Sequence, residues 1–280
     1  MRRVLTLLVA VVVLAGGCSS PVDTDTDTDT DTDSPTDAVV ADLARLPAID
    51  LDTVPLPRSV PGFSVSETHA YAEPVRDLVS SSVLDPRWWD AEPTAATTRR
   101  FLTDLDPRTR REYLRSVQQR NGALPSAQYL VSIFAPDQQP VTAPRVVKAA
   151  WRTQEGRRAD GSLFQRVALQ VIVLYRVGSR DRPLPVVVAR WFQLSGDPRS
   201  ADSWPSLAHY TVVQGIDDCT LYEDGRYEAT PGGLADLGSL RGFLDAARDR
   251  RRWTDFGRDD DQDDAPRDKQ DAACSDRSTS

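Results

Sequence analysis

The residues best suited to acid–base chemistry in this 280-residue chain lie in one stretch, "LAHYTVVQGIDDC". It contains His209, one of only two histidines, and the neighbouring carboxylates Asp217 and Asp218. A histidine and a carboxylate that share a pocket can transfer protons during catalysis. Period-two alternation, however, places His209 on the same strand face as Leu207, which favours a packed or hydrogen-bonded side chain. The three residues are therefore candidates for a pouch, and the sequence indicates no catalytic constellation.

The first residues of the chain predict export. Two arginines are followed by the apolar run from Val4 to Ala15 and then by Gly-Gly-Cys, which is the form of a secretory signal. The run is shorter than the about 20 residues that a membrane-spanning helix needs. We therefore expect residues 1–17 to act as a signal peptide and no ordinary transmembrane helix to be present.

The end of this signal, "LAGGC", resembles the lipobox of bacterial lipoproteins, whose usual form is Leu-Ala/Ser-Gly/Ala-Cys. The small residues match, and the Leu stands one place further back than in the commonest spacing. The resemblance implies that Cys18 becomes the mature N-terminus and carries diacylglycerol on its sulfur. Two acyl chains give stable anchoring, which predicts a protein held on the extracytoplasmic face of the cell membrane. An ordinary signal peptide with an incidental cysteine is the alternative.

Cys219 and Cys274 are the thiols that remain once Cys18 is lipidated. An even pair in an oxidising compartment favours a disulfide. Closing so long a loop stabilises the fold by roughly 4 kcal/mol on loop-entropy grounds. The alternative is a nucleophilic Cys219 paired with His209, but nothing in the local sequence orients such a histidine.

Charge divides the chain into segments. The net charge of the whole chain is −8, but the linker 18–42, with its Thr-Asp repeat, carries −8 and the tail 255–280 carries −5. With +2 in the signal, the body 43–254 carries +3. Both acidic ends have little apolar surface to bury, so we expect them to be disordered. Mutual repulsion should extend the linker and hold the body away from anionic lipid.

The body contains a run of arginines between residues 99 and 115. They are Arg99, Arg100, Arg108, Arg110, Arg111 and Arg115. A basic helical surface of this kind could dock on anionic lipid or cell-wall polymer. Asp104, Asp106 and Glu112 lie among the arginines, so a salt-bridged helix face is the alternative. We expect no nucleic-acid partner outside the cell.

The order of elements in the body is helices first and strands afterwards. Helical periodicity runs over residues 64–85 despite Pro74, and a helix is predicted over 94–105. The next helix begins after Asp106, a good N-cap, and ends near Asn121. Trp88 and Trp89, between the first two, are interpreted as a buried anchor for these helices, with an exposed binding platform as the alternative. An amphipathic helix is predicted over 235–253, with Leu237, Leu240, Leu244 and Ala247 on one stripe.

Strands are predicted over residues 128–136, 145–155, 163–177, 184–196 and 207–225. In the second, Val147 and Trp151 share one face while Lys148 and Arg152 share the other. In the third, Leu163 and every second residue from Val167 to Val177 share one face, opposite Arg166, Gln170 and Arg176. Hairpins of such strands with helices ahead of them make an α+β fold, with N-terminal helices packed on a curved antiparallel sheet of four to six strands.

This element order resembles the nuclear-transport-factor-two-like family of cone-shaped α+β domains over about residues 94–224. The resemblance implies a pouch between helices and sheet, which in related enzymes holds a histidine and a carboxylate. A plain α+β sandwich or a cystatin-like sheet fits the same order. On this reading the chain is an extracytoplasmic lipoprotein whose single domain is a binding or scaffolding module for an envelope protein or cell-wall material.

Two alternative functions stay open at this level. One is a pouch enzyme of polyketide-cyclase or isomerase type that uses His209 with Asp217 or Asp218. The other is a small-molecule carrier with an apolar pouch. The acidic tail lacks the glycine and the closing glutamate of a calcium loop, and His69 lies in no recognisable ligand pattern. We therefore expect no metal and no cofactor.

Overall fold

The chain folds as an α+β domain in the part that the computed structural model describes, residue 41 and residues 43–121, 127–200 and 205–231. Four strands form one antiparallel sheet in the order β1-β2-β3-β4. The strands are β1 (Arg145–Arg157), β2 (Leu163–Gly178), β3 (Pro183–Gly196) and β4 (Ser206–Gln214). The helices are α2 (Val65–Leu84), α3 (Ala95–Phe101), α4 (Pro107–Asn121) and α5 (Asp218–Asp224), with 3-10 turns η1 (Leu51–Thr53), η2 (Pro86–Trp88), η3 (Leu102–Asp104) and η4 (Ala127–Tyr129). The predicted class and the order of helices and sheet are confirmed.

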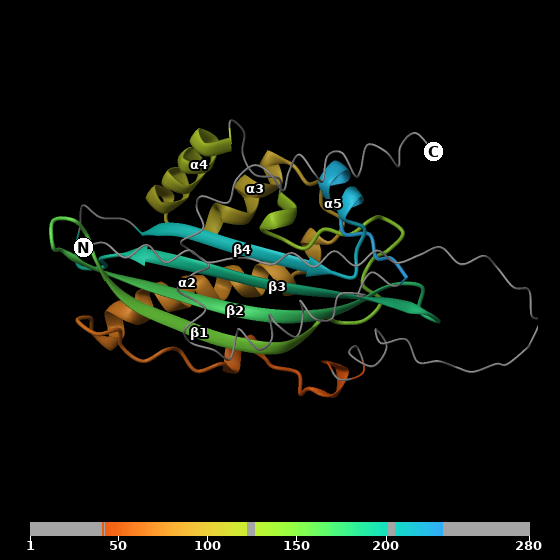
Figure 1. The fold of residues 1–280 in the computed structure, drawn as a ribbon, viewed down its shortest axis with the longest axis horizontal. Coiled ribbons are helices and arrows are strands. Elements are labelled where there is room, and N and C mark those ends of the chain that lie inside the picture. Colours follow the sequence, from red (N-terminus) through yellow and green to blue (C-terminus); the bar gives the residue numbers. More distant parts are fainter. Residues whose placement is uncertain (1–40, 42, 122–126, 201–204, 232–280) are drawn as a thin grey trace, which may run out of the picture. The chain divides into compact units, whose positions relative to one another are not determined.

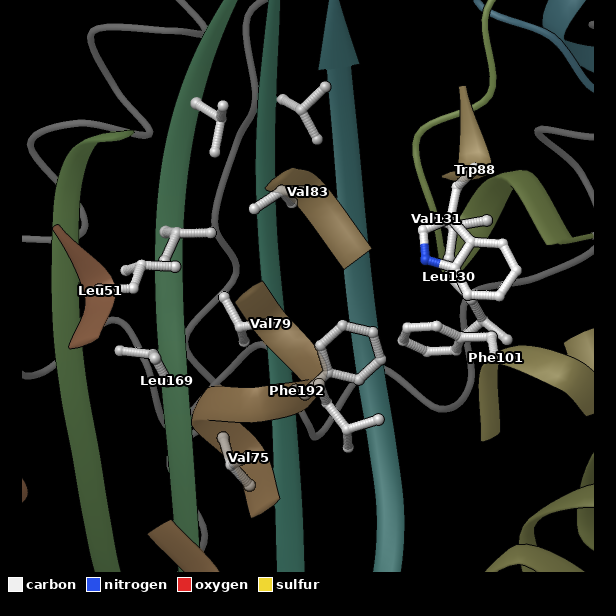
Figure 2. Close-up of a cluster of buried hydrophobic side chains, with 14 of the residues drawn as sticks. Leu51, Val75, Val79, Val83, Trp88, Phe101, Leu130, Val131, Leu169 and Phe192 are labelled. Carbon is white, nitrogen blue, oxygen red and sulfur yellow. The ribbon is translucent and has the colours of Figure 1, made fainter. Parts of the chain in front are cut away.

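Helix α2 covers one face of the sheet, here called the inner face, and packs against β2 and β3 (Figure 1). Val75, Val79 and Val83 recur at every fourth position of the helix and therefore form one stripe. Figure 2 shows this stripe beside Leu169 and Phe192 of the sheet, and all five side chains are buried. Side chains of α2, together with buried residues such as Leu51 and Phe101, therefore fill the inner face.

Local sequence explains where α2 begins. The side chain of Ser64 accepts a hydrogen bond from the Glu67 backbone N–H, and the Glu67 carboxylate accepts one from the Ser64 backbone N–H. This reciprocal capping box satisfies two N–H groups that a helix start leaves without partners. Pro74 lies inside the helix without ending it.

The two faces of β2 follow the predicted alternation. The residues at every second position from Val167 to Val177 belong to the core against α2, and Leu163 packs at its edge. The prediction for β1 was wrong at one residue, because a bulge lies between Val146 and Lys148. Val146 therefore pairs with Val173 on the inner face, and Val147 packs with a separate cluster on the opposite face. An extra residue in one strand shifts every following side chain to the other face, which the alternation alone did not reveal.

The predicted strand over residues 128–136 was also wrong. Apart from the 3-10 turn η4, this segment has only an isolated bridge between Phe134 and Tyr227 within the described residues. Leu130, Val131 and Phe134 are all fully buried, so the segment is an apolar run without alternation. Such a run is compatible with a strand but does not require one. It passes instead beneath the C-terminal end of α2, where Ser132 N–H donates to the Ser82 carbonyl.

The helices α3 and α4 lie beyond the β4 edge of the sheet (Figure 1). The predicted first helix is shorter than expected, since α3 ends at Phe101 and continues as η3. The predicted cap of the second helix is confirmed, because the Asp106 carboxylate accepts hydrogen bonds from the backbone N–H groups of Arg108 and Thr109. Trp88 is buried and makes an edge-on contact with Phe101.

Several predictions concern residues that the structure does not describe. The signal peptide 1–17, Cys18, the linker 18–42 apart from Ala41, the helix over 235–253, the tail 255–280 and Cys274 all lie outside the described residues. Within the described ranges, no helix combines the length and the apolar character that crossing a membrane requires.

Candidate functional site

His209 lies on the inner face of β4 and is engaged in packing. It pairs across the sheet with Phe192, and the two rings stack with centroids 6.1 Å apart. Its Nδ1 lies 3.2 Å from the hydroxyl of Tyr113 on α4, in hydrogen-bond contact. The histidine therefore joins α4 to the sheet edge, as the packed interpretation of the sequence predicts.

The two carboxylates near His209 in sequence lie in a different element. The predicted strand over 207–225 ends at Gln214, and α5 begins at Asp218. Asp217 is the N-cap of α5, and its carboxylate accepts hydrogen bonds from the backbone N–H groups of Cys219 and Thr220. β4 continues for five residues beyond His209, a length of about 17 Å. Asp217 comes only after the end of this strand. The Asp217 carboxylate therefore acts as a helix cap.

Cys219 lies in the first turn of α5, is partly buried and is disulfide-bonded. A disulfide sulfur does not act as a thiolate nucleophile, so this observation does not favour the Cys219–His209 alternative. Both other cysteines, Cys18 and Cys274, lie outside the described residues. The pairing of Cys219 with Cys274 stays a prediction.

The most complete polar arrangement in the domain surrounds Arg190, at the C-terminal end of α2. Arg190 lies on the inner face of β3 and is 0% exposed. Its guanidinium donates from Nε to the Thr211 hydroxyl at 3.0 Å and from Nη2 to the Tyr227 hydroxyl at 2.8 Å. The remaining donors reach the carbonyls of Ser82, Leu130 and Gln128 at 3.0, 3.1 and 3.5 Å. All five N–H donors of the side chain are used, and each acceptor is an uncharged oxygen.

The placement of Arg190 compensates for the cost of its buried charge. Ser82 is in the last turn of α2, and Gln128 and Leu130 lie in and directly after η4. The last carbonyls of a helix have no intrahelical partner and carry partial negative charge. A cation in contact with these carbonyls is therefore stabilised without a carboxylate. The guanidinium connects α2, β3, β4 and the segments at 128–130 and 227.

Tyr175 on β2 completes the cap of α2. Its hydroxyl donates to the Val83 carbonyl at 2.5 Å and contacts the Ser132 hydroxyl at 3.0 Å. Burial is the main cause that raises the pKa of Tyr175 above its ordinary value. The phenol therefore stays neutral at physiological pH and acts as a structural donor.

Sequence reasoning missed this arrangement, although one signal was present. Period-two alternation in "VVVARWFQL" places Arg190 on the same face as Val188 and Phe192, so a charge stands on an apolar face. A charged residue at such a position is rarely buried unless it is fully partnered. Its partners lie between 21 and 108 residues away in the chain, and their convergence could not be read from spacing.

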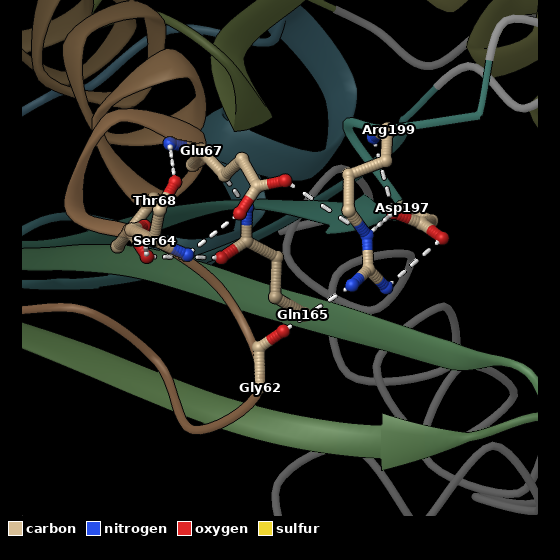
Figure 3. Close-up of polar contacts among 7 residues, drawn as sticks. All are labelled: Gly62, Ser64, Glu67, Thr68, Gln165, Asp197 and Arg199. Carbon is tan, nitrogen blue, oxygen red and sulfur yellow. Dashed lines mark hydrogen bonds and ion pairs between the residues drawn. The ribbon is translucent and has the colours of Figure 1, made fainter.

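A second polar cluster lies at the opposite end of α2 (Figure 3). Arg199 makes a two-pronged ion pair with Asp197, with Nε–Oδ1 at 2.9 Å and Nη2–Oδ2 at 3.2 Å. Its Nη1 donates to the Gly62 carbonyl at 3.3 Å, and its Nε lies 3.9 Å from the Glu67 carboxylate. In Figure 3, Glu67 stands between the start of α2 and Arg199. The cluster fastens the turn after β3 to the beginning of the helix.

The carboxylates of this cluster are held in the charged form. Hydrogen bonds from the backbone and side chain of Ser64 lower the pKa of Glu67, and Arg199 lowers it further. The side-chain hydrogen bond from Arg199 lowers the pKa of Asp197. Burial raises the pKa of the neighbouring Tyr71 to about 12. None of these groups is thereby prepared to exchange protons near neutral pH.

The arginine-rich region predicted from the sequence forms the outer side of α3 and α4. Arg99, Arg100, Arg108, Arg111 and Arg115 are exposed. Among the acids between them, Asp106 caps α4 and Glu112 forms an ion pair with Arg115. The region from residue 95 to residue 115 carries six arginines and three acidic residues, so its net charge is positive. The surface formed by the exposed arginines of this region is here called the arginine surface.

Within the described residues, no group of three or more His, Cys, Asp and Glu side chains could hold a metal ion. His69, the other histidine, has its Nε2 3.1 Å from the Pro57 carbonyl. Comparison of the chain with protein-family models, curated proteins and solved structures finds no match.

Proposed function

We propose that the chain is a lipid-anchored binding module that holds an anionic component of the bacterial cell envelope on its arginine surface. Cys18 would be the anchor, on the strength of the sequence "LAGGC". The acidic linker would hold the body away from anionic lipid head groups, because like charges repel. The body would then meet its partner outside the membrane surface.

The observation that carries this proposal is the exposure of the arginine surface. Arg108, Arg111 and Arg115 are exposed along α4, whereas the buried Arg190 and Tyr175 cap α2. A cation near an anionic surface contributes about 1 kcal/mol to binding. Several cations on one rigid helix therefore give useful affinity for a polyanion without any enclosed pocket.

A charge-reversal experiment tests the surface. The triple variant R108E/R111E/R115E removes its central cations, and R58E/R180E/R182E reverses three other exposed arginines as a matched control. The probe is purified anionic cell-wall polymer, with binding measured by co-sedimentation at increasing salt. At about 1 kcal/mol per cation, we expect the α4 triple variant to bind roughly 100-fold more weakly.

The control variant should bind like the parent protein, and salt should weaken parent binding because it screens exposed charges. Equal losses in both variants would show a diffuse charge effect and overturn the assigned surface. Absence of binding by the parent, or equal binding to anionic lipid vesicles when the linker is intact, would overturn the assigned partner and the stand-off role of the linker.

A further inference from the structure

The face of the sheet that points away from α2, here called the outer face, is built to be covered. Its middle rows pair Lys148 with Ile172 and Ala189, and Ala150 with Gln170 and Trp191 across the strands. Ile172 is fully buried although α2 packs on the other face of the same strand. A strand that is apolar on both faces is expected between two layers.

A described segment from before the strands packs on one end of this face. Leu43, with Ala44 beside it, packs against Ile172 and its neighbours Leu174 and Val187. On the same face of β2, Gln170 lies two residues from Ile172 and is 4% exposed, and Ala168 lies four residues from Ile172 and is 3% exposed. Ala168 packs neither in the core against α2 nor in the cluster around Leu43.

Gln170 supplies an independent sign of an occupant. Its Oε1 is buried and has no hydrogen-bond partner in the described part of the structure. A buried acceptor without a donor costs about 1–3 kcal/mol, and native proteins rarely retain one. A covering segment that brings an N–H or O–H group to this position would satisfy it.

We propose that the outer face is the docking site of the chain's own C-terminal segment, with the stripe Leu237, Leu240, Leu244 and Ala247 packed over Ala168, Gln170 and Ile172. The described chain ends at Pro231, and Thr230 N–H donates to the Gly215 carbonyl directly after β4. The following segment therefore starts at the edge of the face. A helix from Leu237 to Ala247 is about 15 Å long, close to the about 13 Å between Ala168 and Ile172.

The disulfide points to the same occupant, and the tail that follows the occupant is complementary in charge to the face. The outer face carries Lys148, Arg152 and Arg166, and none of the described outer-face strand positions holds Asp or Glu. The tail after the stripe has a net charge of −5 over residues 255–280, whereas residues 235–253 carry +2, so the stripe itself would dock through its apolar residues. Cys219 is disulfide-bonded beside the end of β4, and pairing with Cys274 returns the tail to the point from which the segment departs.

Thiol labelling of the full-length protein tests the docking. Ala168→Cys places a reporter on the outer face, and Ala72→Cys places one in the core between α2 and the sheet. In the otherwise unchanged chain we expect iodoacetamide to label both reporters slowly, as followed by peptide mass. L240D/L244D charges the apolar stripe, and S239D/A246D adds the same two charges on another side of the predicted helix.

In the L240D/L244D variant, iodoacetamide should label Ala168→Cys at least tenfold faster, while Ala72→Cys stays protected. In the S239D/A246D variant, the labelling rate of both reporters should stay low. Fast labelling of Ala168→Cys in the unchanged chain would show an open face and overturn the proposal. An unchanged labelling rate in the L240D/L244D variant would also overturn it.

Three further results would assign the face to another occupant and would equally overturn the proposal. Protection that is lost on dilution would indicate a second copy of the chain, and protection that is lost on detergent extraction would indicate the membrane. Protection that is lost on deletion of residues 23–33 would indicate the Thr-Asp repeat. Faster labelling of both reporters in L240D/L244D would show unfolding of the body rather than undocking, and would overturn the proposal as well.

Discussion

The two ends of α2 solve the same capping problem in opposite environments. At its beginning, Ser64 and Glu67 cap the helix, and Arg199 joins them at the surface. At its end, Arg190 and Tyr175 cap the last carbonyls in the interior. An exposed ion pair is screened by water and contributes about 0–1 kcal/mol, whereas a buried polar group is costly to leave without its partner. The same helix therefore depends far more strongly on its C-terminal cap.

Replacing Arg190 should have the largest effect. Arg190→Met removes five hydrogen bonds from the guanidinium, including those to the carbonyls of Ser82 and Leu130. The Ser82 carbonyl keeps its bond from the Ser132 N–H. Hydrogen bonds that involve a charged group contribute about 1.5–3 kcal/mol each, so we expect the loss of five to lower the free energy of unfolding by more than about 4 kcal/mol. Denaturant unfolding measures this loss, with Arg182→Met at an exposed turn as the control. A loss below about 1 kcal/mol would contradict the structural role of the guanidinium.

Removing one hydroxyl should have an intermediate effect. Tyr175→Phe keeps the ring but leaves the Val83 carbonyl without its donor. We expect a loss of about 1–3 kcal/mol in the free energy of unfolding. Tyr129→Phe, at a ring that is 40% exposed, should change stability by less than about 0.5 kcal/mol. Equal effects in both variants would remove the distinction between the interior cap and the surface.

Breaking the surface ion pairs should have a small effect. Arg199→Ala removes the partner of Asp197 and Glu67 at a side chain that is 43% exposed. We expect a loss of at most about 1 kcal/mol, reduced further in high salt. Thermal unfolding at low and high salt measures it. A larger loss that salt does not change would indicate that the cluster, like the other end of α2, is a stability centre.

Acid should act through the same end of the helix. The folded state lowers the pKa of Glu67 from its ordinary value of 4.5 and that of Asp197 from 3.8. A carboxylate with a lowered pKa contributes stability above its unfolded pKa and loses it as pH falls through the folded pKa. Stability should therefore decline below about pH 4.5, and Glu67→Gln should flatten the first part of the decline. An unchanged pH profile in this variant would show that other carboxylates control the transition.

The sequence could predict features that depend on neighbouring residues, and it could not predict contacts between distant segments. The start of α4 was predictable, because Asp106 and Pro107 are a local signal for a cap and a first turn. The alternation in β2 was predictable for the same reason. The cap around Arg190 was not, since its partners lie on α2, in the segment at 128–130, on β4 and at Tyr227.

Two errors in the predicted strands have physical causes of the same kind. The bulge at Val147 inserts one residue without any local signal such as glycine. The segment containing Leu130 and Ile133 is apolar enough for a buried strand, but its backbone groups bond to α2 and to Tyr227. Asp217 was considered as a carboxylate for His209, and its role as a helix cap became visible only with α5 in place. Local patterns identified elements, and tertiary contacts decided which residues meet.

We propose that Cys18 holds this folded body at the outer face of the cell membrane, where its arginine surface would reach an envelope partner. The most direct test is the mass of the N-terminal peptide from protein extracted from membranes. We predict a peptide that begins at Cys18 and carries diacylglycerol on its sulfur. An N-terminal peptide that begins after Cys18, that retains residues 1–17, or that begins at Cys18 without lipid would contradict the claim.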